Sequence, residues 1–227
     1  MGGLNEGERA SQTARGFLMN ALKNLDSQDP ELVKQKMREF FETASARVQD
    51  TVKNGGTTAT AVKFIKTNVG ARVIVGHVGD SRAYLVSANE RKITQVTKDD
   101  SILENSDLPA ERKREIVQKL ERAVAPSDIE TPEEYRYWSQ RNRVTQWLGK
   151  EGGISPQVYD IPVKEGDIVL LTTDGVHDNL SSREVGQVSV VTNNEVALVN
   201  WITQKANWRA TGEEFDEALS QKPLYER

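Results

Sequence analysis

Hydrophobic residues at the start of the chain recur every three to four positions, which is the spacing of helices with one buried face. In the first run, between residues 7 and 25, they are Ala10, Ala14, Phe17, Leu18, Ala21 and Leu25. A second run starts at Asp29-Pro30, a pair typical of an N-cap followed by the first helical residue. Its hydrophobic members are Leu32, Met37, Phe40, Phe41, Ala44, Val48 and Val52, and Asn54-Gly55-Gly56 ends it. This pattern predicts two long amphipathic helices.

The pattern then changes to short segments rich in β-branched residues, as is typical of strands. The predicted strands are residues 57–65, 71–78, 83–86, 92–96, 155–163 and 167–173. Tight loops between the first four predict an antiparallel meander, and a polar turn is expected at 174–182. A last helix is predicted at 195–208. Helices at both ends of a run of antiparallel strands indicate an α+β fold.

Residues 101–141 interrupt the strands with a polar, highly charged segment that has a helical pattern from about Pro109 to Ala123. We interpret it as a surface subdomain inserted into a single domain that spans residues 1–227. A solvated insertion without a role is an equally good interpretation of its charge.

Composition excludes several classes of protein. The net charge is -4, which argues against a basic footprint for nucleic acid. The sequence contains no cysteine, and hence no disulfide framework or thiolate metal site. No apolar stretch approaches the roughly 20 residues of a membrane span. We therefore expect a cytoplasmic protein with neither a nucleic-acid nor a membrane partner.

Two Gly/Asp turns follow predicted strands. Asp80 lies in the first turn, at 76–82, and Asp174 in the second, at 172–179. Carboxylates at strand ends are suitable ligands for Mg²⁺ or Mn²⁺, which prefer oxygen donors. Asp is also an ordinary turn former that caps its own backbone, so the residue types alone leave both interpretations open. Nearby, His77 is expected to be a half-buried histidine with its hydrogen bonds satisfied.

Five short blocks add to this pattern: GGTTA at 55–59, VGDSRAYL at 78–85, TKDDS at 97–101, NRVTQWLG at 142–149 and, after Gly166-Asp167, TDGV at 173–176. In order and spacing they resemble the signature blocks of the PPM (type 2C) metal-dependent serine/threonine protein phosphatases. The resemblance covers roughly residues 1–205. It implies an α/β/β/α sandwich of two antiparallel sheets flanked by helices, with 101–141 corresponding to the family's flap beside the active site. The charge of this segment suits a substrate-facing surface as well as it suits a solvated insertion without a role.

The resemblance also implies a chemistry. In this family two Mg²⁺ or Mn²⁺ ions activate a water molecule that hydrolyses phosphoserine or phosphothreonine in a protein substrate, and no protein nucleophile is needed. Asp174 matches a ligand of the core metal pair, and Asp80 matches an aspartate that helps to hold an additional, more weakly bound metal. His177 and Asp178 are close enough to Asp174 in the sequence to hold its side chain in position for a metal, or alternatively to cap the following helix.

The sequence departs from the family pattern in three places. Asp100 stands where the family's Asp-His-Ser segment has histidine. Gly2 and Gly3 resemble the end of the family's Asp-Gly-x-Gly-Gly motif, so the bridging aspartate would precede residue 1. The closing Asp-Asp/Asn segment has no counterpart before Arg227.

From these departures we expect a domain truncated at both ends, which binds metal poorly, has little activity by itself and associates through an unpaired sheet edge. The alternative is a non-catalytic pseudophosphatase that serves as a binding module in a signalling pathway.

Overall fold

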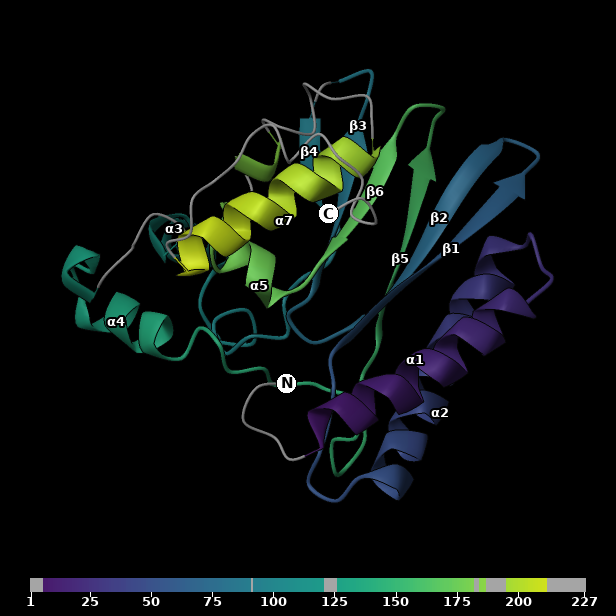
Figure 1. Cartoon of the computed structure of the whole chain (residues 1–227), viewed down its shortest axis with the longest axis horizontal. Helices are drawn as coiled ribbons and strands as arrows, with labels where there is room; N and C mark the ends of the chain where they lie inside the picture. Colours follow the sequence, from purple (N-terminus) through teal and green to yellow (C-terminus); the bar gives the residue numbers. More distant parts are fainter. Residues whose placement is uncertain (1–5, 91, 121–125, 182–183, 187–194, 212–227) are drawn as a thin grey trace. The chain divides into compact units, whose positions relative to one another are not determined.

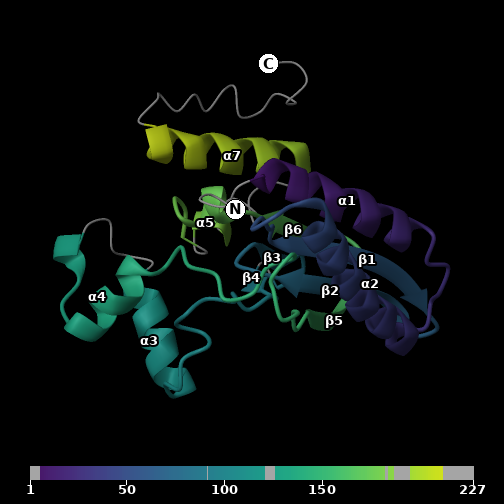
Figure 2. The same cartoon turned by 90° about the horizontal axis from the view of Figure 1, so that it is seen from below.

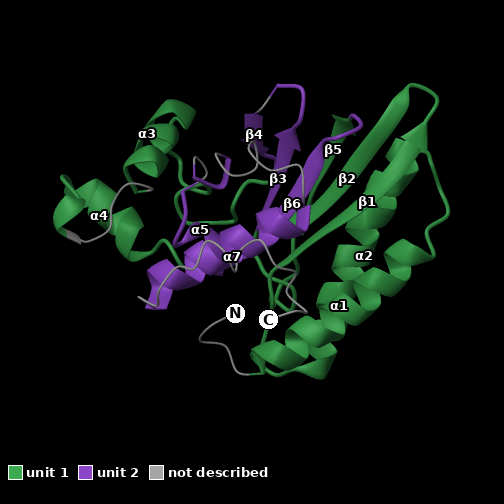
Figure 3. Ribbon diagram, turned by 45° about the horizontal axis from the view of Figure 1, so that its top comes forward, with its two compact units in different colours: residues 1–81, 97–163 green, residues 82–96, 164–227 purple. Residues whose placement is uncertain are grey.

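A computed structural model describes residues 6–90, 92–120, 126–181, 184–186 and 195–211. The chain divides into two compact units, which are coloured separately in Figure 3. Unit 1 comprises residues 1–81 and 97–163, and unit 2 comprises residues 82–96 and 164–227.

Unit 1 begins with the two predicted helices, α1 (Gly7–Lys23) and α2 (Pro30–Thr51). Asp29 caps α2, because its side chain accepts a hydrogen bond of 3.0 Å from the Glu31 amide and Pro30 occupies the first helical position. The buried residues of α1 are Ala10, Ala14, Leu18 and Leu22, and those of α2 include Val33, Met37, Phe41, Ala44 and Val48. The two predicted helices are confirmed. Their buried stripes are confirmed only in part, because Leu32 is 40% exposed, whereas Leu22 and Val33 are buried without having been predicted.

The sheet of unit 1 has the strand order β1-β2-β5 and is antiparallel throughout. Its strands are β1 (Ala59–Thr67), β2 (Gly70–Val78) and β5 (Gln157–Val163). Figure 1 shows α1 and α2 side by side along one face of this sheet. The contact with α2 is close at Gly76, where a Cβ atom would lie 2.6 Å from side-chain atoms of Met37 and Phe41. The main core of unit 1 forms between these helices and the sheet.

Residues 101–144 leave this sheet and form a helical lobe within unit 1, seen clearly in Figure 2. The lobe contains α3 (Ala110–Leu120), a 3₁₀ turn (Pro126–Asp128) and α4 (Pro132–Ser139). It has its own small core of Leu103, Ile116 and Tyr137, and an isolated bridge between Ser101 and Val144 closes its base. The interpretation of this lobe as a flap within one domain stays a prediction.

The sheet of unit 2 has the order β4-β3-β6. Its strands are β3 (Arg82–Ser87), β4 (Lys92–Gln95) and β6 (Ile168–Thr172), and its helices are α5 (Asp174–His177) and α7 (Glu195–Thr211). Leu198, Ile202 and Ala206 of α7 pack with Tyr84 and Leu170 of the sheet. The predicted class, two antiparallel sheets flanked by helices in an α+β fold, is confirmed.

Two sequence predictions are corrected by the topology. The first four strands do not form one meander, because β1 and β2 belong to one sheet and β3 and β4 to the other. The chain changes sheets at residues 79–81, where Gly79 has a φ of 115°. The polar turn predicted at 174–182 begins as a helical turn, α5. In the described part of the chain, no helix is both long and apolar enough to cross a bilayer.

Candidate functional site

The Asp80 turn of unit 1 is built on a glycine. Gly79 has a φ of 115°, in the region that favours glycine, and a Cβ atom there would lie 2.4 Å from Cγ2 of Thr58. Beside it, the hydroxyl groups of Thr58 and Ser81 are 3.1 Å apart and hydrogen bonded. The close approach of Thr58 and the backbone conformation both require glycine immediately before Asp80.

Asp100 holds the same turn from the other side. Its Oδ2 accepts a hydrogen bond of 2.8 Å from the Gly79 amide, and its own amide donates to the Gly79 carbonyl at 2.7 Å. Its Oδ1 accepts from Nε2 of Gln157 at 2.8 Å. The residue is 6% exposed, and burial raises the pKa of its carboxyl group, against the hydrogen bond from Gly79. Asp100 thus fixes both the amide and the carbonyl group of Gly79, the residue before Asp80.

The backbone of Asp100 also holds the base of the helical lobe. Its carbonyl oxygen accepts hydrogen bonds from the Thr145 amide at 2.7 Å and from the Thr145 hydroxyl at 2.8 Å. Asp100 therefore joins the Asp80 turn to the point where the lobe ends and the chain returns to the rest of unit 1. Sequence analysis missed this role, although the replacement of the family's histidine by Asp100 was a signal that this position is special in this chain.

His77 completes the buried network beneath the turn. It is 0% exposed, so the prediction of a half-buried side chain is wrong, but its hydrogen bonds are satisfied as predicted. Nε2 donates to the Gly79 carbonyl at 2.9 Å, and Nδ1 lies 3.0 Å from the Thr60 hydroxyl. Burial lowers the pKa of His77, and the negative charges of Asp100 and Asp99 oppose this effect. The environment therefore favours neutral imidazole.

Lowering the pH from about 7.5 to about 6 is expected to reduce the free energy of unfolding. The pKa of His77 is lower in the folded chain than the value of 6.5 expected in the unfolded chain. Neutral His77 therefore contributes its full stabilisation above pH 6.5, and this stabilisation is lost as the pH falls through the folded pKa. Urea titrations across this range measure the effect. The variant His77→Gln should show a shallower pH dependence, whereas His177→Gln, which removes the other of the two histidines, should retain that of His77. Equal slopes for the wild type and His77→Gln would contradict the prediction.

Asp174 in unit 2 is the first residue of α5, two residues after the end of β6. Thr172 pairs with Arg82 at the end of the β6–β3 ladder, which fixes where the chain leaves the sheet. The Asp174 side chain is exposed, and its Oδ1 accepts a hydrogen bond of 2.9 Å from the Gly175 amide. Asp174 therefore follows the end of β6, as the sequence predicted, and its bond with Gly175 is the capping contact that the sequence left open beside metal binding.

His177 ends α5, and Asp178 is its C-cap, with its amide donating to the Asp174 carbonyl at 2.9 Å. A cap of the next helical residues comes from Ser181. The Ser181 hydroxyl accepts from the Glu184 amide at 3.4 Å, and the Glu184 carboxylate accepts from the Ser181 amide at 3.1 Å. Both roles considered for His177 and Asp178 stay predictions. Gly2 and Gly3 lie outside the described residues.

Whether these residues could hold a pair of metal ions depends on how many carboxylate oxygens they bring together. Among the described residues, no three His, Asp or Glu side chains come together in a group that could hold a metal ion. Asp174 offers an exposed carboxylate that is already hydrogen bonded to its own helix. A bridged pair of ions requires shared carboxylate oxygens. The described residues do not fit a complete two-metal centre by themselves.

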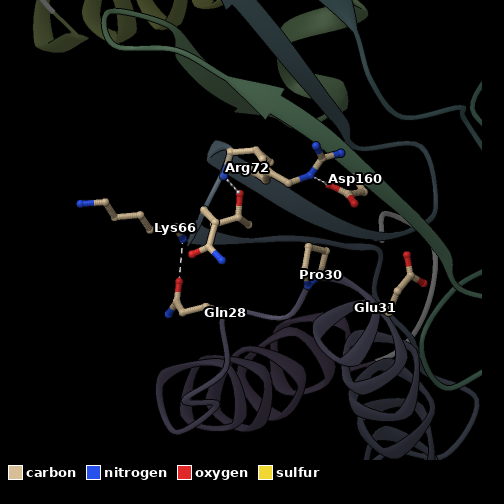
Figure 4. Close-up of a pocket in the computed structure, with 9 residues that line it drawn as sticks. Gln28, Pro30, Glu31, Lys66, Arg72 and Asp160 are labelled. Carbon is tan, nitrogen blue, oxygen red and sulfur yellow. Dashed lines mark hydrogen bonds and ion pairs between the residues drawn. The ribbon is translucent and has the colours of Figure 1, made fainter.

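A hollow of about 550 Å³ in unit 1 lies elsewhere (Figure 4). It is lined by the loop before α2 and the β1–β2 hairpin, and its Arg72 forms an ion pair of 2.6 Å with Asp160. Since β2 begins at this hollow and Asp80 follows the other end of the strand, about nine residues at ~3.3 Å each separate the two. The hollow is not part of the Asp80 turn.

Comparisons with known proteins agree with this scaffold. The family model "Protein phosphatase 2C" matches residues 3–117, about half of the 227-residue chain. The chain belongs to the protein phosphatase 2C family. The serine/threonine protein phosphatase PstP of Mycobacterium tuberculosis is 28% identical over 193 residues, which cover 82% of this chain and 32% of that protein. The chain thus spans about a third of the length of this relative.

Solved structures show the same fold. The Streptococcus agalactiae (S. agalactiae) serine/threonine phosphatase superposes with a TM-score of 0.70 at 24% identity, covering 92% of this chain and 78% of that chain. The catalytic domain of PstP in complex with two manganese ions gives a TM-score of 0.58 at 23% identity, covering 91% of this chain and 79% of that chain. The resemblance to PPM phosphatases noted in the sequence is confirmed.

Proposed function

We propose that this chain is a metal-dependent serine/threonine protein phosphatase domain, which hydrolyses phosphoserine and phosphothreonine monoesters of protein substrates. The family match over residues 3–117 is the observation that carries the proposal. The exposed carboxylate of Asp174, held at the end of β6, supports it. No contact or comparison described above favours the alternative of a non-catalytic binding module.

Within this function, Asp174 is the ligand of the core metal site and Asp80 a peripheral ligand. His177 and Asp178 support Asp174 from the same helical turn. Gly2 and Gly3 belong to the motif that precedes α1. The metal is Mg²⁺ or Mn²⁺, which share a preference for oxygen ligands, and the manganese ions of the PstP structure support this choice. The absence of a membrane-spanning helix in the described residues is compatible with a cytoplasmic signalling protein.

Association through a sheet edge is part of the proposal. In the described part of the chain, β1 has a ladder partner on one side only, which is β2. Phe64 on this strand is 60% exposed. An edge of this kind offers unpaired backbone groups to another strand.

The purified 227-residue chain is expected to hydrolyse a phosphothreonine peptide slowly in the presence of Mn²⁺, because its described carboxylates do not complete a metal pair. Phosphate release, measured with and without Mn²⁺, tests this. Asp174→Asn should lower the residual rate by about tenfold or more. Asp107→Asn, which changes an exposed carboxylate in the helical lobe, should leave it unchanged.

Two results would count against the proposal. A rate that is the same in the wild type and in Asp174→Asn would remove Asp174 from the metal site. The complete absence of Mn²⁺-dependent hydrolysis would favour the non-catalytic module. Fast hydrolysis by the wild-type chain would instead show that the expectation of weak activity is wrong.

A further inference from the structure

The helix α4 carries an exposed group of aromatic rings and arginines. The rings of Tyr135 and Trp138 stack with their centroids 6.2 Å apart and their planes inclined by 26°. The Arg141 guanidinium lies 4.3 Å from the centre of the Trp138 ring, and Arg143 follows in the turn that ends the helix. Tyr135 is 50% exposed, and both arginines are exposed. We call these four residues the α4 surface.

Two other cations of the same lobe are neutralised by carboxylates. Arg112 is bound to Glu133 at 2.6 Å, and Lys119 is bound to the buried Glu134 at 2.9 Å. Within the part of the chain that the structure describes, Arg141 and Arg143 form no ion pair with a carboxylate. Arg141 is held instead by its hydrogen bond of 3.0 Å to the Trp138 carbonyl and by the ring beneath it. Its charge is oriented but not neutralised by an acidic side chain.

The charge of the lobe is divided along the sequence in the same way. Residues 101–134 contain nine acidic and five basic residues, whereas residues 135–144 contain three basic residues and no acidic one. An excess of positive charge therefore coincides with the exposed rings. A net charge of -4 for the whole chain argues against nucleic acid as the partner of such a surface.

We propose that the α4 surface binds an acidic segment that flanks the phosphorylated residue of a protein substrate. The proposal rests on the proposed phosphatase function for the identity of this partner. Guanidinium groups bind carboxylates through paired hydrogen bonds, and an arginine already ordered against a ring loses less freedom on binding. The stacked rings of Tyr135 and Trp138 offer a rigid apolar platform beside the charges.

The test is a fluorescence anisotropy titration in the presence of EDTA, which prevents hydrolysis. The probe is a labelled phosphothreonine peptide with glutamate at the flanking positions, compared with the same peptide carrying glutamine there. The variant Arg141→Glu/Arg143→Glu should weaken binding of the acidic peptide by about tenfold or more, because attraction becomes repulsion at the surface. The matched control is Arg15→Glu/Arg38→Glu, which makes the same change in net charge at exposed positions of α1 and α2 and should have a much smaller effect.

Equal losses in the two double variants, or no loss in either, would overturn the proposal. Tighter binding of a single-stranded oligonucleotide that displaces the peptide would also overturn it. Hydrolysis of p-nitrophenyl phosphate, which has no flanking peptide, is measured in parallel and should be the same in both variants and the wild type. Peptide binding that depends on Arg141 and Arg143 without any hydrolysis would sustain the α4 surface while contradicting the proposed function.

Discussion

The substitution Gly79→Ala is expected to lower the free energy of unfolding of unit 1 by about 3 kcal/mol or more. Two effects add. The backbone φ of 115° disfavours any residue with a side chain, and the new Cβ would lie 2.4 Å from Cγ2 of Thr58. Because Gly79 is also held on both sides by Asp100, the turn has little freedom to relax. Urea titration and hydrogen exchange of the β2 amides measure the loss.

Gly70→Ala is the matched control for this prediction. Gly70 has a φ of 127°, but no atom lies within 4 Å of the position its Cβ would take. This variant should show only the backbone strain, a loss of about 1 kcal/mol. Equal losses at the two positions would show that the contact with Thr58 relaxes at no cost, and would contradict the description of a rigid turn.

The substitution Asp100→Ala is expected to lower the free energy of unfolding by about 2–4 kcal/mol, since it removes the acceptor for two buried or half-buried donors. The Gly79 amide and the Gln157 side chain would both lose their carboxylate partner. Hydrogen exchange at Gly79 should rise more than exchange in α2, since the bond is local to the turn. Burial raises the pKa of Asp100 and so disfavours its ionised form in the folded chain. The expected loss of stability is therefore smaller than for a carboxylate in a fully favourable charge pair.

Asp107→Ala provides the control for Asp100. Asp107 is an exposed aspartate in the same lobe, and its removal should change stability by no more than about 0.5 kcal/mol. A loss at Asp100 as small as this would mean that water or a neighbouring group replaces the carboxylate, and Asp100 would not be what holds the turn.

Local signals predicted much of the fold. The N-cap at Asp29 and the existence of α1 depend on residues close together in the sequence, and both were predicted correctly, although buried Leu22 of α1 was missed. The strands were found for the same reason, although their pairing was not. Strands of both sheets have similar patterns, so nothing local indicates that the chain enters a second sheet after β2. That change depends on the conformation of Gly79 and on its contact with Thr58.

The residues of the candidate site were predicted less completely than the helices and strands. Asp174 was singled out because it follows a single strand. It begins α5 where a polar turn was predicted, and its role as a metal ligand stays a prediction. The role of Asp100 depends on contacts with Gly79, Thr145 and Gln157, which are distant in sequence, so the sequence marked this residue only as a departure from the family pattern. For the same reason His77 was expected to be only half-buried: its burial depends on how the strands and loops pack around it.

The central claim is that this phosphatase-family chain carries its core metal ligand at Asp174. The most direct test is a titration of the purified wild-type chain and of Asp174→Asn with Mn²⁺, following the free ion by electron paramagnetic resonance. We predict weak, saturable binding by the wild type, because one or two carboxylates leave most of the ion's coordination to water, and a clear further loss in Asp174→Asn. Tight binding that is unchanged by Asp174→Asn would contradict the account.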